Sequence, residues 1–252
     1  MGGSVEGSVG LDLKQSGILV IGGSGGIGSA LVDRLCEARA TRIVVTSLRP
    51  SAAGAHRPGV MVESVDVAEL ASVRSLAERL KGLDISVVIN CAGVNGNRRL
   101  RAGDALEIAR REMDVNVFGL MNVAAVFAPL LAGRGGGTFM TVLSFLSHVN
   151  LPLMASYCAS KAAAHSLTQA LRAEWRHHGV KVCGVYPTAV DTTMSSDLQG
   201  PKQSPADLAA NMVAALAGGD EELFPGDAAA AHAEWMRNPK EMERAMAAAV
   251  QG

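Results

Sequence analysis

The fold is decided near the start of the chain by the stretch Gly17-ILVIGGSGGIGSALVDRLC-Glu37. Its first part, residues 18–21, is an apolar run of strand length, and its last part, from Gly26 onward, has the apolar spacing of a helix. A glycine-rich turn joins the two parts. Backbone N–H groups at the start of such a helix, where its dipole is positive, bind the pyrophosphate of a dinucleotide. The stretch therefore predicts a strand, a turn and a helix that together form a nucleotide site.

Two glycine spacings coexist in this turn, and the local sequence does not choose between them. One runs through Gly23, Gly25 and Gly28, and the other runs through Gly22, Gly26 and Gly28. With either spacing, the bare glycines let the backbone approach a phosphate closely. The alternative is a glycine-rich turn that binds nothing. The residues predicted to contact the pyrophosphate are Gly22, Ser24, Gly25, Gly26, Ile27 and Gly28.

Farther along the chain, apolar runs of strand length alternate with longer segments of helical period, which is typical of βαβ units around a parallel sheet. Strands are expected at 18–21, 43–46, 60–63, 85–90, 138–143, 180–186 and 222–224, and helices at 26–38, 70–80, 105–131, 154–175, 205–216 and 229–248. We therefore expect an α/β fold: a doubly wound, seven-stranded parallel sheet with helices on both faces, Rossmann-like. Residues 16–252 are expected to form one dinucleotide-binding catalytic domain, preceded by a flexible arm of residues 1–15.

Composition narrows the class of function. The 252 residues are 48% hydrophobic and 19% charged, and 23 Lys and Arg against 24 Asp and Glu give a net charge of -1. This balance lacks the positive charge that binds nucleic acid or an anionic membrane. The apolar run 123–131 is broken by Pro129 and is too short for a membrane helix. The cysteines form no C-x-x-C pair and the histidines match no metal motif, so we expect a soluble cytoplasmic protein without a metal.

The end of the second expected strand indicates which nucleotide binds. A carboxylate about 20 residues after the glycine turn would grip the adenosine ribose, but this chain has Ser47, Leu48 and Arg49 there. A hydroxyl and a guanidinium suit a 2′-phosphate, which arginine pairs with bidentately. We therefore expect these three residues to contact the cofactor, and NADP(H) to be favoured over NAD(H). The alternative is that Arg49 points into water.

Four polar residues between positions 116 and 161 form a candidate catalytic set. Tyr157 and Lys161 are four residues apart on an expected helix, so they share a face of it. A free phenol, with an ordinary pKa of about 10, is a poor base at neutral pH, and a nearby cation favours the phenolate and lowers that pKa. Taken singly, each residue also has a structural explanation, such as a strand cap, a half-buried tyrosine or a solvated charge. The set is Asn116, Ser144, Tyr157 and Lys161.

From residue 16 to residue 224 the chain resembles the short-chain dehydrogenase/reductase family in its single-domain form. The resemblance rests on seven motifs in order: the glycine turn, Asp66-Val67, the turn Asn90-Cys-Ala-Gly93, Asn116, Ser144, Tyr157 with Lys161, and the segment 187–192. It implies an NAD(P)-dependent oxidoreductase acting on CH–OH and C=O groups, in which Tyr157 donates the proton during reduction. It also implies that Ser144 hydrogen-bonds the substrate oxygen, that Lys161 holds the nicotinamide ribose, and that Asn116 anchors a water beside Lys161.

The same resemblance implies further cofactor contacts. They are Asp66, Val67, Asn90, Ala92, Gly93, Tyr157, Lys161, Pro187, Thr188, Val190 and Thr192. For Asp66, a helix N-cap is an equally good explanation. Three positions depart from the family pattern, because Ile21, Cys91 and Thr188 stand where threonine, asparagine and glycine are usual. These departures put the affinity for the cofactor in doubt and leave the acid/base set intact.

The segment 192–205 occupies the position of the family's substrate lid, and its few bulky apolar residues predict an open pocket. Apolar walls then favour a hydrophobic ketone or aldehyde. His148 lies on the segment that should border the substrate and is a candidate ligand contact. A basic patch after the Asn-x-Ala-Gly turn is either a solvated loop or a surface that docks an acidic carrier domain. The expected walls are Leu146, Leu153, Met154 and Met194, and the patch is Arg98, Arg99 and Arg101.

The expected function is NADPH-dependent reduction of a carbonyl group on a small, mainly hydrophobic substrate. The alternatives are NAD(P)+-dependent oxidation of an alcohol and a non-catalytic nucleotide-sensing protein of the same fold. The catalytic set argues against the sensor, because binding alone has no use for an activated phenol. The helices around Asn116 and after Tyr157 are apolar on nearly every face, and the family commonly packs these helices together. We therefore expect a homotetramer or homodimer.

Overall fold

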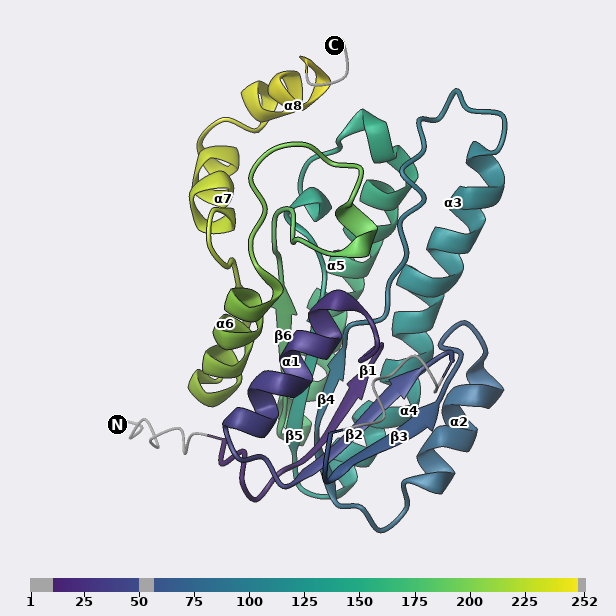
Figure 1. The fold of residues 1–252 in the computed structure, drawn as a ribbon, viewed down its shortest axis with the longest axis vertical. Helices are drawn as coiled ribbons and strands as arrows, with labels where there is room; N and C mark the ends of the chain where they lie inside the picture. The colour runs from purple at the N-terminus through teal and green to yellow at the C-terminus, as the bar shows by residue number, and fades with distance from the viewer. Residues whose placement is uncertain (1–10, 50–56, 249–252) are drawn as a thin grey trace.

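Apolar residues, many of them β-branched, build the strands of one parallel sheet. A computed structural model describes residues 11–49 and 57–248 of the chain. Within them, seven parallel strands lie in the order β3-β2-β1-β4-β5-β6-β7 (Figure 1). The strands are β1 Gly17–Ile21, β2 Arg42–Ser47, β3 Val60–Ser64, β4 Ile85–Asn90, β5 Gly137–Val142, β6 Val180–Val185 and β7 Glu222–Leu223. The predicted α/β fold class is confirmed.

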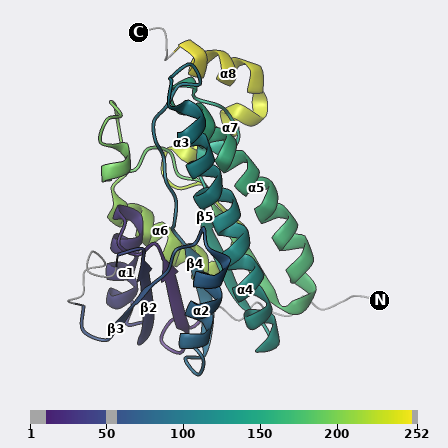
Figure 2. The same cartoon turned by 90° about the vertical axis from the view of Figure 1, so that its right-hand side faces the viewer.

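Helices cover both faces of the sheet. Helices α1 and α6 pack on one face, and α2, α4 and α5 pack on the other, as the two perpendicular views show (Figures 1 and 2). This layering follows from right-handed crossovers between parallel strands. The α-helices are α1 Gly26–Glu37, α2 Leu70–Arg79, α3 Ala105–Met113, α4 Gly119–Gly133, α5 Ala155–Trp175, α6 Pro205–Gly218, α7 Ala228–Arg237 and α8 Pro239–Ala248.

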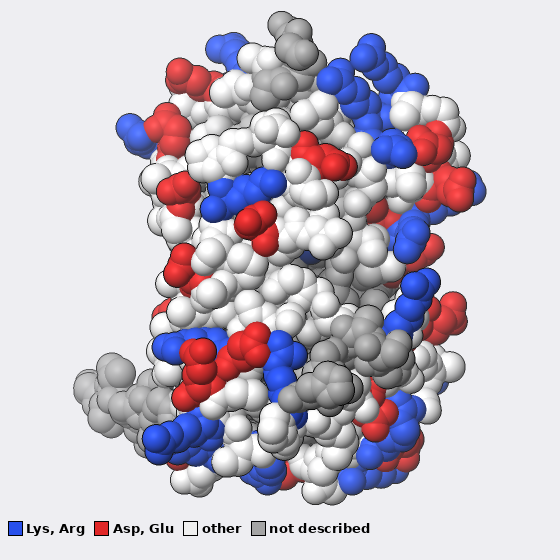
Figure 3. Space-filling view, viewed as in Figure 1, with Lys and Arg blue, Asp and Glu red and all other residues white. Residues whose placement is uncertain are grey.

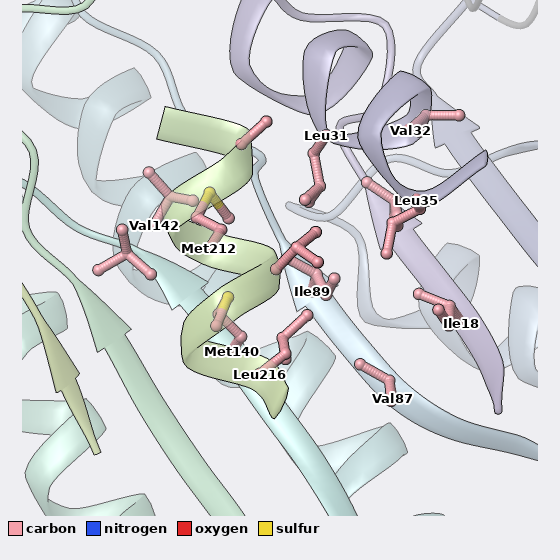
Figure 4. Close-up of a cluster of buried hydrophobic side chains, with 14 of the residues drawn as sticks. Ile18, Leu31, Val32, Leu35, Val87, Ile89, Met140, Val142, Met212 and Leu216 are labelled. Carbon is pink, nitrogen blue, oxygen red and sulfur yellow. The ribbon is translucent and has the colours of Figure 1, made fainter. Parts of the chain in front are cut away.

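The sheet divides the core into two clusters because successive strand residues point to opposite faces. Ile18 on β1 packs with Leu31 and Leu35 of α1 and with Met212 of α6 on one side (Figure 4). Its neighbour Leu19 packs on the other side, in the cluster that α2, α4 and α5 share. Strands buried on both faces read as continuous apolar runs, which is why the sequence pattern located them well.

The helix expected at 105–131 is interrupted. Helices α3 and α4 are separated by a π-helical turn, Asp114–Phe118, which contains Asn116. Taken as one helical stretch, Ala105–Gly133 is long and apolar enough by length and composition to cross a membrane, which the shorter run 123–131 is not. Half of its most apolar 18-residue window is buried inside the fold. Its apolar composition therefore reflects packing against the sheet.

Both ends of the described chain differ from expectation. The helix expected at 229–248 is broken between α7 and α8, because Asn238 precedes Pro239 and is extended (φ -147°, ψ 77°), a conformation that a following proline favours. At the other end, Leu11 and Leu13 pack against the core, and Lys14 and Gln15 hydrogen-bond the Asp12 side chain. Residues 11–15 thus belong to the folded unit, and the rest of the expected arm, 1–10, lies outside the described residues. The boundary at residue 16 stays a prediction.

The strand order places a crevice above β1 and β4. From β1 the chain builds outward through β2 and β3, and then crosses to β4 on the other side of β1 and builds in the opposite direction. Ligands of open α/β sheets bind outside the carboxyl ends of the strands at this reversal. The glycine turn after β1 and the turn after β4 meet there, since Cys91 N donates to Ile21 O (2.8 Å).

Candidate active site

Two adjoining cavities open at the carboxyl ends of the strands. The larger, of about 410 Å3, runs from the glycine turn past the ends of β2 and β3 to the turn after β4. Most of the predicted cofactor residues line it: Gly22, Ser24, Gly25, Gly26, Ile27, Gly28, Ser47, Leu48, Asp66, Val67, Ala92, Gly93 and Thr192. We refer to it below as the nucleotide cavity.

The glycine turn has the geometry that a bound pyrophosphate requires. Gly22 has a positive φ of 75°, and an added Cβ would lie 2.7 Å from Ala92 N. A Cβ at Gly28 would lie 2.4 Å from Gly22 O, whereas one at Gly25 would meet nothing closer than 3.5 Å. The contacts therefore favour the spacing through Gly22, Gly26 and Gly28. The loop can close onto the start of α1 only with bare backbone at those positions.

Chemically, the nucleotide cavity fits a dinucleotide. Helix α1 begins after Gly25, whose position supplies no side-chain cap to the first N–H groups of the helix. These donors and the positive helix end suit an anion. The hydroxyl of Thr46 lines the same cavity, is buried and has no hydrogen-bond partner within the described chain. A buried unpaired hydroxyl is unfavourable, and a ligand hydroxyl would satisfy it.

The end of β2 differs in part from expectation. The hydroxyls of Ser24 and Ser47 are 2.8 Å apart, and Arg49 N donates to Ser47 Oγ (3.2 Å). Arg49 is exposed and does not line the cavity. Its contact with a 2′-phosphate stays a prediction. Arg111 on α3 does line the cavity, and sequence reasoning missed it because nothing distinguished it from the adjacent Arg110.

Asp66 and Asn90 shape the turns beside the cavity. Asp66 Oδ1 accepts from Ala68 N (3.0 Å), and the N-cap of α2 is Glu69. The N-cap interpretation of Asp66 is therefore wrong, and Asp66 lines the cavity beside Val67. Asn90 is buried, and its Oδ1 accepts from Ala92 N (3.2 Å). Asn90 does not line the cavity, so its predicted cofactor contact is replaced in this structure by support of the turn.

The second cavity, of about 270 Å3, is lined by three of the four residues of the candidate catalytic set and is called the substrate cavity here. Ser144, Tyr157 and Lys161 all line it, although they come from the end of β5 and from α5. Pro187, Thr188, Val190 and Thr192, predicted near the nicotinamide, line it as well. The two cavities share Ile27, Cys91, Gly93, Thr192 and Met194. A dinucleotide in the first cavity can therefore present its reactive end to the second.

Lys161 faces Tyr157 as the helical spacing predicts. Its Nζ lies 5.7 Å from the centre of the Tyr157 ring and donates to Val142 O (2.9 Å). Both side chains are buried. Burial lowers the pKa of Lys161 to about 8, with Cys91 opposing this effect. The ammonium can thus lose its proton near neutral pH, which a solvated lysine does not.

Tyr157 differs from expectation in the direction of its pKa. Burial raises the pKa of the phenol above its usual value, and a hydrogen bond with the Ser144 side chain acts in the opposite direction. The sequence predicted a lowered pKa, from Lys161 and from the positive nicotinamide ring of an oxidised cofactor, because it gave no measure of desolvation. Desolvation disfavours the phenolate, so the protein by itself keeps this group protonated.

Asn116 acts through its neighbours. Its Oδ1 accepts from Val94 N (2.8 Å), and its Nδ2 donates to Val94 O (2.9 Å) and to Ser160 Oγ (2.9 Å). Ser160 Oγ in turn donates to Tyr157 O (2.7 Å). The side chain therefore ties the π-helical turn to the loop after β4 and to α5. Anchoring of a water beside Lys161 stays a prediction.

The walls of the substrate cavity are mostly apolar. Leu146, Met154 and Met194 line it as predicted, but Leu153 does not. Leu151 and Leu198 take part instead, together with Met246 from α8. Sequence reasoning missed Met246 because the helix that carries it lies far along the chain from every motif.

The segment 192–205 is better ordered than the sequence suggested. A short 3-10 helix, Thr193–Ser195, is closed by reciprocal hydrogen bonds between Thr192 and Ser195. Lys202 Nζ donates to Ser195 O (2.8 Å), and Gln203 pairs with Val190. The segment thus forms one wall of the substrate cavity.

His148 lies away from the substrate cavity, among the rings of His165, Tyr186, Phe224, His232 and Trp235. Burial lowers its pKa to about 4, and the nearby histidines act in the same direction. The suggestion that it contacts a ligand is not supported, because its ring packs α7 onto the body of the protein. In the basic patch, Arg98 pairs with Asp104 (2.9 Å).

Comparison with known proteins agrees with this site. A family model described as short chain dehydrogenase matches residues 16–203. A crystal structure of a short chain dehydrogenase from Burkholderia cenocepacia in complex with NADP is similar with a TM-score of 0.86 and 33% identity, covering 93% of this chain and 98% of that one. Galactitol 2-dehydrogenase of Rhizobium johnstonii is 31% identical over 186 residues, which cover 70% of this chain and 72% of that protein.

A third relative is longer. An uncharacterised short-chain type dehydrogenase/reductase of Sinorhizobium fredii is 31% identical over 189 residues, which cover 72% of this chain but 34% of that protein. The described site, the family model and these similarities lead to one conclusion. The chain belongs to the short-chain dehydrogenase/reductase family of nicotinamide-dependent oxidoreductases.

Proposed function

We propose that the protein reduces a carbonyl group of a small, uncharged and mainly hydrophobic substrate with NADPH. The observation that carries this proposal is the buried set of Ser144, Tyr157 and Lys161, which lies where the nucleotide cavity meets the apolar substrate cavity. Binding alone would not require a buried phenol and a buried amine beside one another, because both are costly to desolvate.

Each residue has a separate task in this reaction. When bound, the nicotinamide supplies the hydride that reaches the carbonyl carbon. Tyr157 gives its hydroxyl proton to the carbonyl oxygen as general acid, and Ser144 donates a hydrogen bond to the same oxygen as negative charge develops there. Lys161 holds the nicotinamide ribose and restores the proton to Tyr157. Asn116 keeps the loop after β4 and α5 in register with one another.

Reduction is favoured over alcohol oxidation by the state of Tyr157. Burial raises the pKa of this phenol, so the protonated form, which reduction needs, predominates at neutral pH. Oxidation needs the phenolate as a base, and the charge of an oxidised nicotinamide would have to offset the burial. The protein environment therefore supports a proton donor.

The preference for NADPH rests on the end of β2. Ser47 and Arg49 stand where a carboxylate would repel a 2′-phosphate, and the hydroxyl of Ser24 in the glycine turn lies 2.8 Å from that of Ser47. The similar chain from Burkholderia cenocepacia was crystallised with NADP. A 2′-phosphate beside two hydroxyls and an arginine would gain charge-assisted hydrogen bonds.

The substrate class follows from the cavity walls. Among the described residues that line the substrate cavity, Lys161 is the one that is an Asp, Glu, His, Lys or Arg, and the reaction itself uses it. A carboxylate or phosphate on the substrate would therefore find no dedicated partner. Localisation in the cytoplasm is part of the proposal, since the four cysteines are unpaired and thiols persist in a reducing compartment.

Turnover tests the proposal directly. Loss of NADPH absorbance is measured with a panel of apolar ketones and aldehydes, for the native protein and for Tyr157→Phe, with NADH in parallel. We expect turnover by the native protein, a loss of at least about a hundredfold in Tyr157→Phe from removal of the general acid, and lower KM for NADPH than for NADH. Equal rates in the two proteins would exclude Tyr157 as the acid. No turnover with tight NADPH binding would instead favour a nucleotide sensor.

A further inference from the structure

One face of α3 and the π-helical turn holds the loop that follows β4. Ile108, Glu112 and Asn116 follow one another at four-residue spacing, so they lie on one side of the helical stretch. Asn116 binds the loop through both backbone groups of Val94. Glu112 Oε1 accepts from Gly96 N (2.8 Å). We call residues 93–97 the β4 loop.

Gly96 packs so closely against α3 that a side chain there would displace Ile108 or the loop. A Cβ at Gly96 would lie 2.3 Å from Ile108 Cγ2. Between the two anchored positions, Val94 and Gly96, lies Asn95, which lines the substrate cavity. The Nδ2 of Asn95 contacts Met154 Sδ (3.5 Å), another wall of that cavity. The helix face thus sets where a polar group stands in the substrate cavity.

Glu112 is an unusual residue for a purely structural anchor. It is 1% exposed, and its second carboxylate oxygen is buried with no hydrogen-bond partner in the described chain. A glutamine could accept the same bond from Gly96 without burying a charge, which is costly when unpaired.

That charge lies close to the catalytic helix. Helix α3 packs against α5, and Glu112 raises the pKa values of Tyr157 and Cys158 at the start of α5. The other groups that face Tyr157 are Ser144 after β5 and Lys161 on α5. Cys158 is a neutral thiol at neutral pH because burial raises its pKa to about 11. Lys161 and Glu112 are thus the two groups around the phenol that carry charge, and their signs are opposite.

We propose that Glu112 is a positioning residue for the reaction, one whose hydrogen bond to Gly96 holds Asn95 in the wall of the substrate cavity. The inference rests on the proposed function. It adds a residue, outside the catalytic set, that fixes the place of a polar group in the substrate cavity.

Two substitutions separate the hydrogen bond of Glu112 from its charge. Glu112→Gln keeps an acceptor for Gly96 and removes the charge, whereas Glu112→Leu removes both. Glu107→Gln is the matched control, because Glu107 is an exposed carboxylate on the same helix. The readouts are the KM for a ketone that the native protein reduces with NADPH, and hydrogen exchange of the Gly96 amide.

Glutamine still accepts a hydrogen bond from Gly96 N, so we expect Glu112→Gln to keep KM and Gly96 exchange near native. Glu112→Leu should raise KM severalfold and speed exchange at Gly96, because the loop loses this anchor. Glu107→Gln should change neither.

Unchanged KM and exchange in Glu112→Leu, or the same losses in Glu112→Gln, would overturn the role of the hydrogen bond. If Glu112→Leu does not fold, Gly96→Ala displaces the same loop from Ile108 and must raise KM. A native protein without turnover would refute the proposed function instead, and hydrogen exchange would still test the anchoring of Gly96.

Discussion

Tyr157 and Lys161 are one turn apart on α5, yet burial moves their pKa values in opposite directions. The pKa of the phenol is raised and that of the amine is lowered to about 8. Desolvation favours the neutral form of each group. The site is therefore poised with a protonated acid beside a lysine that can release a proton. The helical spacing revealed the pair, but the direction of the phenol shift depended on how deeply the fold buries it.

Replacing Lys161 should abolish activity and increase the stability of the fold. The pKa of Lys161 is depressed in the folded state. The buried charge therefore lowers the stability of the fold by a constant amount at every pH below about 8. This destabilisation disappears as pH rises through the pKa that Lys161 has in the unfolded chain. We expect Lys161→Met to stabilise the fold at neutral pH by about 2 kcal/mol, less the lost bond to Val142 O. The gain should vanish towards pH ~10.5. NADPH turnover should be lost.

Denaturant unfolding of both proteins across pH measures this difference, with NADPH turnover assayed alongside. If Lys161→Met were less stable than the native protein at neutral pH, and by the same amount at high pH, Lys161 would be shown to stabilise the fold. Unchanged turnover would remove it from the mechanism.

At the scale of elements, the glycine turn and the π-helical turn bring the site together. The glycine turn lets the start of α1 approach the strand ends, and the π-helical turn aims Asn116 at Val94 and Ser160. The sequence pattern predicted the glycine turn, because its closely spaced Gly residues interrupt the apolar pattern between a strand and a helix. It missed the second, because one extra residue in a helical turn leaves an apolar pattern almost unchanged.

The glycine turn makes a sharp element-scale prediction. Gly28→Ala places a Cβ 2.4 Å from the backbone oxygen of Gly22, and neither partner is a flexible side chain that can move away. We expect NADPH affinity to fall at least about tenfold, a loss of ~1.4 kcal/mol of binding free energy. Fluorescence titration of NADPH checks this.

Gly103→Ala is the control, since a Cβ there meets nothing within 4 Å and Gly103 has no positive φ. That variant should bind NADPH as the native protein does. Native affinity in Gly28→Ala would show that the turn can rearrange, and would count against a tight pyrophosphate loop.

Over the whole molecule, charge is spread without a dominant sign, as Figure 3 shows for one face. Lys and Arg side chains gather at the upper right of that view, over the loop before α3. The net charge of -1 agrees with a small uncharged substrate and offers no general attraction to polyanions.

The outer surface of α4, together with the π-helical turn before it, exposes large apolar side chains. Phe118 is 53% exposed and Met121 is 45% exposed. A groove beside Met121 runs between α4 and α5 and is lined by Ala124, Leu167 and Trp175 among others. Apolar side chains left in water on adjacent helices favour burial against another surface. Because both helices belong to the same face, a second copy of this chain is the partner we propose, in a homodimer or homotetramer.

A charge on this surface should prevent assembly. We expect the native protein to sediment as a dimer or tetramer and the double variant Phe118→Glu, Met121→Glu to sediment as a monomer, because two carboxylates cannot be buried unpaired. Met236→Glu on α7, which replaces another exposed methionine (64%), should leave assembly unchanged. Sedimentation velocity distinguishes the species, and a native monomer would contradict the proposal.

The sequence by itself determined the fold class and the family, and it named the residues of the proposed catalytic set. These features depend on local patterns, which can be recognised in the sequence alone. The patterns are continuous apolar strands, glycine at close approaches and a Tyr–Lys pair at helical spacing. Only the tertiary structure decided the remaining features: Met246 and Leu198 as walls, Asn90 as turn support, His148 in a ring cluster and Glu112 beneath the β4 loop. Each depends on contacts between segments far apart in the chain, and burial, which sets the protonation of Tyr157 and Lys161, exists only once those segments have met.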